Sequence, residues 1–187
     1  MCSNGVMTRQ FNFGLLAVDG ASGAQGDRFL EAKRFLESEL RAKYSHASRE
    51  ALKELDEMRP YVSYYKAFGY TYHVLLQLES VAKGKAIPGA LPPVAAMFMA
   101  ELKNGILTAG HDLDAVCFSV RSMVSDGTEG YTTLDSKAVT CVAGDFLIAD
   151  QAGILSSMLR GPDRRTAISR ETKRFLYTAY APDGLPD

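Results

Sequence analysis

The chain has 187 residues, of which 47% are hydrophobic and 23% charged, and its formal net charge is −1. This composition is typical of a globular protein and excludes a disordered or fibrous chain. The length fits one ordinary domain, so we expect a single domain over residues 1–187. A nearly neutral molecule has no general attraction for nucleic acid. We therefore expect no DNA partner, and an RNA contact would need a local basic patch.

The sequence predicts neither a membrane span nor a signal peptide. The uncharged run from Ile87 to Ala100 is too rich in proline and too short, since a span needs about 20 residues. The N-terminal segment from Met1 to Arg9 lacks the apolar core of a signal peptide. We therefore expect a cytoplasmic protein with no membrane partner.

The first half of the chain is predicted to be mainly helical. An apolar run from Phe11 to Val18 comes first and is expected to be a strand. Hydrophobic residues then recur at helical spacing in five segments. These are Asp27 to about Tyr44, a helix capped by Ser48 with apolar positions to Met58, a short helix from Pro60 to about Gly69, Val74 to Val81 before Gly84, and Pro92 to Asn104.

The second half is predicted to consist mainly of strands. After Ala115, the residues Val116, Phe118 and Val120 alternate with smaller or polar ones, which is the period of a strand. Because helices precede strands without a βαβ repeat, the pattern predicts an α+β fold with a mostly antiparallel or mixed sheet. Further strands are expected at Tyr131–Leu134, Ala138–Val142, Phe146–Ala149 and Ile154–Met158, and Phe175–Ala181 can be a strand or a helix end.

The helix that begins at Pro92 carries an apolar face, which we expect to point into the core. Its inward residues are expected to pack on the predicted strands, because the two patterns are complementary. The helical residues are Val94, Met97, Phe98 and Leu102, and the strand residues are Val116, Phe118, Leu147 and Ile154.

Three histidines limit the acid–base chemistry available to the chain. His46 lies in a polar segment and is expected at the surface, and His73 is expected to be partly exposed at the start of a helix. His111, between Gly110 and Asp112, is predicted to leave a glycine turn. It could act as a donor or base near neutral pH. Alternatively, the neighbouring aspartates hold the turn and His111 only faces water.

Other chemistries find little support. Cys117, Cys141 and His111 lack the paired spacing of zinc sites, so we expect no metal. Ser156 and Ser157 lack the Gly-x-Ser-x-Gly elbow of serine hydrolases. No glycine-rich phosphate loop is present, and no cofactor is expected.

A basic segment runs from Arg160 to Arg174. It holds six basic and two acidic residues, a local balance of +4 in a chain whose net charge is −1. Such a segment can hold phosphates. The alternative is a solvated surface with one or two internal ion pairs.

Several further motifs occur in a characteristic order between about Met58 and Tyr180. Together they resemble the B3/B4 domain, the editing module of the phenylalanyl-tRNA synthetase beta subunit, and especially its stand-alone bacterial relatives. The motifs are Tyr64–Gly69, Glu79–Gly84 with the following Lys85-Ala86-Ile87-Pro88, Gly105–Asp114, Asp145–Asp150, Gly153–Leu155, Arg165–Ile168 and Glu171–Lys173.

The resemblance implies metal-independent hydrolysis of a mischarged aminoacyl-tRNA in trans, or of an allied ester. It places the pocket between the helix Val94–Lys103, the turn at Gly110 and the segment Asp163–Thr166. The implied partners are tRNA or aminoacyl-tRNA and a small amino-acid-like ligand. The implied catalytic residues are Gly110, His111 and Asp163, the pocket residues are Ala95, Phe98, Ala109, Asp112 and Thr166, and the tRNA-binding residues are Arg160, Arg164, Arg165 and Lys173.

The sequence departs from the family pattern at several pocket positions. The polar helix residues of the family fall on Ala95 and Phe98, and a family histidine falls on Ala109. The acidic residue that recognises a substrate hydroxyl falls near Asp163 or Arg164. These changes predict a more apolar pocket. They leave two alternatives open: a non-catalytic binding module for a free amino acid or similar small molecule, and RNA binding without chemistry.

Overall fold

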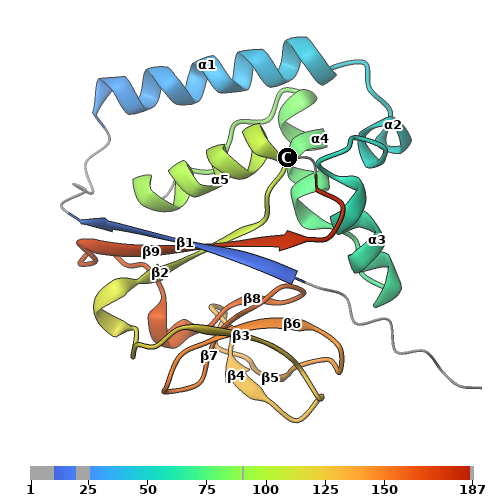
Figure 1. Ribbon diagram of the computed structural model, residues 1–187. Helices are drawn as coiled ribbons and strands as arrows, with labels where there is room; N and C mark the ends of the chain where they lie inside the picture. Colours follow the sequence, from blue (N-terminus) through green and yellow to red (C-terminus); the bar gives the residue numbers. More distant parts are fainter. Residues whose placement is uncertain (1–10, 20–25, 90, 186–187) are drawn as a thin grey trace, which may run out of the picture.

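The structure is a computed structural model that describes residues 11–19, 26–89 and 91–185. Helices form one layer, a three-stranded sheet lies in the middle, and a four-stranded and a two-stranded sheet lie on the other side (Figure 1). The α+β class predicted from the sequence is confirmed. Whether residues 1–187 form one domain stays a prediction.

All five predicted helices are present. They are α1 (Asp27–Tyr44), α2 (Arg49–Lys53), α3 (Arg59–Ala67), α4 (His73–Ala82) and α5 (Pro92–Asn104). The Ser48 hydroxyl caps α2 by accepting a hydrogen bond from the Ala51 amide at 3.1 Å. Only α2 is clearly shorter than predicted, because the chain turns before α3 begins at Arg59.

Every pair of adjacent strands is antiparallel. The middle sheet has the order β1-β9-β2, with Gly110 of β2 opposite Tyr177 of β9. A four-stranded sheet has the order β3-β6-β7-β8, and β4 pairs with β5. The bounds are β1 (Phe11–Asp19), β2 (Thr108–Asp112), β3 (Arg121–Val124), β4 (Gly130–Thr132), β5 (Ala138–Thr140), β6 (Phe146–Ala149), β7 (Ile154–Ser157), β8 (Gly161–Pro162) and β9 (Arg174–Pro182), with 3-10 turns η1 (Leu113–Ala115) and η2 (Arg164–Thr166).

The predicted turn at Gly110 is wrong, because residues Thr108–Asp112 form strand β2. Ala109 and His111 are buried, as alternate residues of a strand can be. The turn instead lies at the end of this strand, at Asp112. There the Asp112 carboxylate accepts a hydrogen bond from the Asp114 amide at 3.0 Å and starts η1.

The strand predicted around Val116–Val120 is also wrong, because β3 begins only at Arg121. The Cys117 amide donates to the Asp150 carboxylate at 2.8 Å instead of to a neighbouring strand. Phe118, expected in the core, is 55% exposed. Alternation over only a few residues therefore predicted a strand, and a buried Phe118, that the structure does not have.

The apolar face of α5 packs partly as predicted. Leu102 and Val116 are buried in the main core, whereas Phe98 only packs at its edge. Leu147 and Ile154 belong instead to a second, smaller cluster beneath the four-stranded sheet. The expected packing of α5 on these two residues is therefore not found, and its half-buried residues face a cavity.

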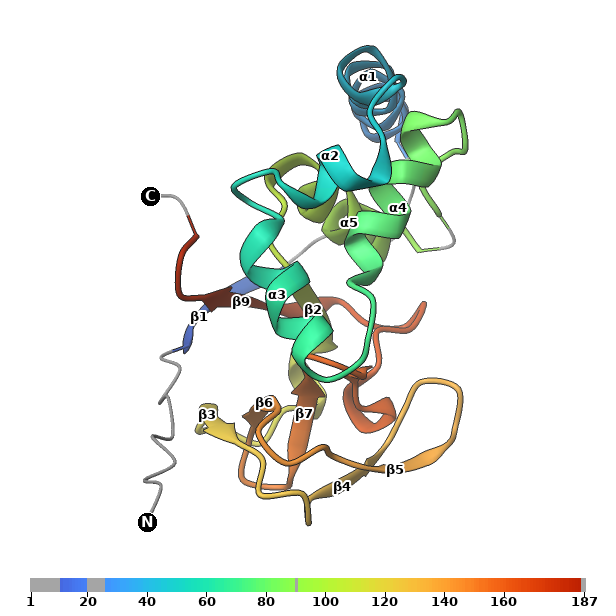
Figure 2. The same ribbon diagram turned by 90° about the vertical axis from the view of Figure 1, so that its right-hand side faces the viewer.

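Three buried tyrosines of α3 connect the helical layer to the strands. Figure 2 shows α3 between the other helices and strands β6 and β7. Tyr61 donates a hydrogen bond to the Tyr180 carbonyl on β9, and Tyr65 donates one to the Met158 carbonyl after β7. Tyr64 donates to the Asp145 carboxylate at 2.8 Å. Each buried hydroxyl therefore has a partner, as burial requires.

We predict that Tyr64→Phe lowers the free energy of unfolding by about 1–3 kcal/mol, because a buried carboxylate loses a donor. The Tyr64 hydroxyl also accepts a hydrogen bond from the Phe146 amide at 2.7 Å. Denaturant unfolding measures the change. Tyr70→Phe at the exposed end of the helical layer is the control, and its effect should stay within about 0.5 kcal/mol. Equal effects of the two substitutions would contradict the assigned role of Tyr64.

Candidate functional site

A cavity of about 180 Å³ lies between α5, β2 and the segments on either side of β8. Helix α5 contributes Val94, Met97, Phe98 and Glu101, which recur at helical spacing along one face. The other lining residues are His73, Leu107, Thr108, Ala109, Gly110, Leu134, Ser157, Met158, Gly161, Pro162, Ala167, Ile168 and Tyr180.

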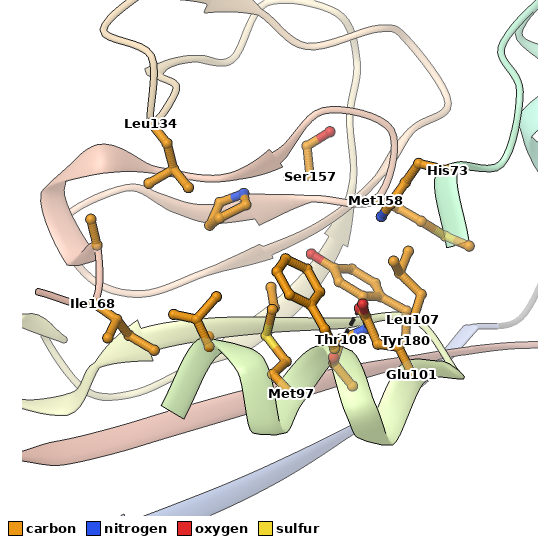
Figure 3. A pocket seen from close by; sticks show the side chains of 17 residues that line it. His73, Met97, Glu101, Leu107, Thr108, Leu134, Ser157, Met158, Ile168 and Tyr180 are labelled. Carbon is orange, nitrogen blue, oxygen red and sulfur yellow. Dashed lines mark hydrogen bonds between the residues drawn. The ribbon is translucent and has the colours of Figure 1, made fainter. Parts of the chain in front are cut away.

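The residues that line the cavity are spread along α5. Figure 3 shows Ile168 towards one end, Met97 near the middle, and His73 and Glu101 towards the other end. Leu134 and Ser157 lie on the side opposite the helix. A ligand aligned with α5 would therefore have an apolar end and an end that faces two titratable groups.

Gly110 keeps the middle of the cavity open. A Cβ atom at this position would lie 2.8 Å from Cδ1 of Ile168 and 3.3 Å from the Met97 sulfur. Both neighbours are ends of flexible side chains that line the cavity. A larger residue at position 110 would therefore push them into the space that a ligand would use.

The volume limits the size of the ligand. An apolar cavity of about 150 Å³ holds a benzene molecule. The present 180 Å³ therefore suits one aromatic ring or one branched aliphatic side chain. A nucleoside is larger and would have to lie outside.

Glu101 is the polar residue of this site that the sequence analysis missed. The side chain is only 1% exposed, and its Oε1 accepts hydrogen bonds from both the amide and the hydroxyl of Thr108 at 2.9 Å. Its Oε2 accepts no hydrogen bond from the described residues. Burial raises the pKa of this carboxyl to about 7. A single acid on the otherwise apolar face of α5 was the signal that could have found it.

Two of the other polar groups of the cavity, on Tyr180 and Ser157, are engaged in hydrogen bonds, whereas His73 is exposed. The Tyr180 hydroxyl donates to Ser156 at 2.6 Å, and the Ser157 hydroxyl donates to Asp145. His73 is exposed on one side and packs its ring against Tyr65 and Tyr72 on the other. Partial burial lowers the pKa of His73 below its usual value, so the imidazole is neutral at pH 7.

The structure brings some of the predicted site residues together and separates others. Phe98, Ala109 and Gly110 line the cavity, and the segment after Asp163 reaches it through Ala167 and Ile168. Among the residues that do not line it are Ala95, His111, Asp112, Asp163 and Thr166. Three predicted site residues therefore lie at one cavity, whereas His111 and Asp163, two of the three predicted catalytic residues, do not line it.

His111 is fully buried, so the alternative of a water-facing histidine is wrong. Its Nδ1 lies 2.9 Å from the Thr166 hydroxyl, which connects β2 to η2. Burial, followed by the charge of Arg165, lowers the pKa of His111 to about 4. The imidazole is therefore neutral at pH 7, and its hydrogen bond joins two structural elements.

Asp163 caps η2. One carboxylate oxygen accepts a hydrogen bond from the Arg165 amide at 3.1 Å, and the other lies 3.6 Å from the Arg165 guanidinium. Asp112 is similarly engaged, since its Oδ2 accepts a hydrogen bond from the Thr172 hydroxyl at 2.7 Å. Both carboxylates therefore hold turns.

The predicted tRNA-binding residues have different surroundings. Arg165 donates to the Ala115 carbonyl at 3.0 Å and to Asp150 at 2.9 Å, so it makes an internal ion pair. Arg160 is exposed and donates to the hydroxyl of Tyr70 at 3.1 Å. Arg164 and Lys173 are also exposed. The basic segment thus combines an internal ion pair with exposed cations.

No protein family and no curated protein matches the chain by sequence. Among solved structures, the chain is similar to a crystal structure of an N-terminal fragment of the phenylalanyl-tRNA synthetase beta subunit from Pyrococcus horikoshii. The TM-score is 0.43 at 14% identity, and the match covers 47% of this chain and 33% of that chain. This chain therefore spans about a third of the structure it matches. At this level the similarity carries no argument about function.

Neither a membrane-spanning helix nor a cluster of metal ligands is found in the described part of the chain. Its helices include none that is both long and apolar enough to cross a membrane. Within the same ranges, no group of three or more His, Cys, Asp or Glu residues is placed to hold a metal ion.

We predict that Arg165→Ala lowers the free energy of unfolding by about 1–3 kcal/mol, because buried Asp150 loses a charged partner. The loss is limited because Asp150 keeps the amide donors of Cys117, Ala152 and Gly153. Arg164→Ala removes an exposed cation and should change stability by less than about 0.5 kcal/mol. Denaturant unfolding compares the two variants. Similar stability of both would contradict the structural role of Arg165.

We predict that Glu101 makes stability dependent on pH. Its pKa is about 7 in the folded protein against 4.5 unfolded. Its stabilising contribution is therefore fully present below pH 4.5 and is lost as the pH rises through about 7. At about 1.4 kcal/mol per unit, the loss is roughly 3 kcal/mol. Denaturant unfolding of the natural protein and Glu101→Gln across this range measures it. A constant difference between the two proteins would contradict the prediction.

Proposed function

We propose that the cavity beside α5 binds an apolar, amino-acid-sized group, and that the protein hydrolyses aminoacyl-tRNA esters through it. The observation that carries the proposal is an apolar cavity of about 180 Å³ whose wall holds a carboxylate oxygen without a partner in the described chain. A concave apolar site with few polar groups is the usual form of a small-ligand pocket. The resemblance to B3/B4 domains supports the choice of ester.

The cavity has room for only one of the two parts of such a substrate, the amino acid and the terminal nucleoside. An amino acid side chain fits, and the terminal adenosine of a tRNA has to remain outside. Exposed Arg160 lies next to Gly161 of the cavity wall and contacts exposed Tyr70. Arginine and aromatic side chains are common partners of unpaired RNA bases and phosphates. We therefore assign the RNA contact to this pair and to the exposed Arg164.

His73 is the residue best placed for proton transfer. It lines the cavity, is exposed on one side, and is neutral near pH 7. In the proposed reaction, a water molecule attacks the ester carbonyl carbon while His73 accepts the water proton. The proton then passes to the ribose oxygen as the ester C–O bond breaks. His73 takes the role of base that the sequence analysis considered for His111.

The second candidate is a binding module without catalysis. The positions of His111 and Asp163 outside the cavity favour it, as do the apolar residues at Ala95 and Phe98. In this case the natural ligand would be a free small molecule with an apolar body. A panel of charged tRNAs, incubated with the purified protein, separates the two candidates.

We predict that Gly110→Val abolishes deacylation, because its side chain displaces Ile168 and Met97 into the cavity. Gly14→Val on β1 of the same sheet is the matched control, since a Cβ there meets nothing closer than 3.8 Å. Initial rates of tRNA deacylation and melting temperatures are measured for both. The control should keep its rate, and Gly110→Val should keep most of its stability.

His73→Ala completes this experiment. Loss of a general base lowers the rate by about 10²-fold or more. A fully active Gly110→Val protein would rule out the cavity as the site. A natural protein that deacylates no tRNA, but whose melting temperature rises with free amino acids, would favour the binding module.

A further inference from the structure

Glu101 carries the one acidic group among the residues that line the cavity. The other titratable side chains there are His73 of α4 and Tyr180 of β9, and neither is a cation at pH 7. No lysine or arginine lines the cavity, and no ion pair involves Glu101 within the described ranges. A buried carboxylate in such surroundings is stabilised by a proton or by a cation from outside the chain.

The contact with Thr108 does not explain why this residue is an acid. Oε1 joins the end of α5 to the start of β2 through two hydrogen bonds from Thr108. The amide oxygen of a glutamine could accept both bonds without a buried charge. Oε2 takes no part in this contact and accepts no other hydrogen bond from the described chain. The second oxygen is therefore a buried acceptor without a partner among the described residues, and we take it as the candidate contact for a ligand group.

We propose that Glu101 binds the primary ammonium group of the ligand, so that the site selects amino acids whose carboxyl group is esterified or amidated. This inference rests on the proposed function of the cavity. It names Glu101 as a specificity-determining residue and an α-amino ester or amide as the substrate class.

The discrimination against free amino acids follows from charge. An ammonium group held by Oε2 brings the carboxyl group of the same amino acid within a few bonds of Glu101. A free carboxylate there meets a like charge in surroundings that screen it poorly. An ester or amide carbonyl is uncharged and escapes this repulsion. The aminoacyl group of a tRNA is such an ester.

The geometry orients the rest of the ligand. With the ammonium at Glu101, the side chain can extend along α5 past Met97 to Gly110 and Ile168, where the lining is apolar (Figure 3). The carbonyl then lies at the end of the cavity that His73 lines. The position proposed for the ammonium therefore also brings the ester towards the proposed base.

Three probes that share one side chain test the inference at about pH 7, where α-amino groups carry a proton. L-Phenylalaninamide has an ammonium and an uncharged carbonyl, L-phenylalanine adds a carboxylate, and N-acetyl-L-phenylalaninamide lacks the ammonium. Dissociation constants are measured by calorimetry on the full chain. We expect phenylalaninamide to bind at least about tenfold more tightly than either of the others.

Glu101→Gln is the matched variant, because it keeps an acceptor for Thr108 and removes the charge. It should bind phenylalaninamide at least about tenfold more weakly and lose the preference over the N-acetyl probe. Circular dichroism checks that it folds. If it does not fold, the order of the three dissociation constants on the natural protein still tests the role of Glu101.

Three outcomes overturn one or other of two claims. Equal binding of all three probes by the natural protein would overturn the role of Glu101 and leave the apolar cavity as the binding site. Unchanged selectivity in Glu101→Gln would also overturn the role of Glu101. No binding of any probe, together with no deacylation of any charged tRNA, would instead overturn the proposed function itself.

Discussion

The burial of three tyrosines on α3, each with its hydroxyl hydrogen-bonded, is the constraint on which the rest of the structure depends. A tyrosine hydroxyl leaves water only if a partner replaces it. Here the partners are backbone and side-chain oxygens from the strand-rich second half of the chain, including the carbonyls of Met158 and Tyr180. Met158 and Tyr180 also line the cavity. The same hydrogen bonds that join the layers therefore position two walls of the candidate site.

The opposite wall depends on a second connection between elements. Glu101, near the end of α5, holds the first residue of β2 through Thr108. Without a side chain at Gly110, the strand leaves open the space that α5 faces. Because both walls are held by buried polar contacts, the cavity exists before any ligand arrives, which lowers the entropy lost on binding. The same burial raises the pKa of Glu101.

The fold was predictable where a pattern is repeated and local. The helices follow from spacing over several turns, and β6 from a continuous apolar run between Asp145 and Asp150. Strand β2 could not be recognised, because its residues are typical of a turn and its pairing with β9 spans more than sixty positions. Side-chain roles were harder still. Arg165 forms an internal ion pair and His111 is buried, and both depend on residues far away in the sequence.

The acid of α5 that lines the cavity is not at a position where the resemblance to B3/B4 domains implies a polar residue. The resemblance to B3/B4 domains places polar residues at positions 95 and 98, where this chain has alanine and phenylalanine. Glu101 lies three residues after Phe98 and lines the same cavity. Along a helix, a step of three residues keeps a side chain on the same face and moves it by about one turn. The acid of α5 therefore lies about one turn beyond Phe98, towards the end of the cavity that His73 also lines. An acid at this position meets one end of a ligand and leaves the apolar part of the cavity open. Positions 95 and 98 alone do not reveal this acid. The whole face of α5, which includes Glu101, does.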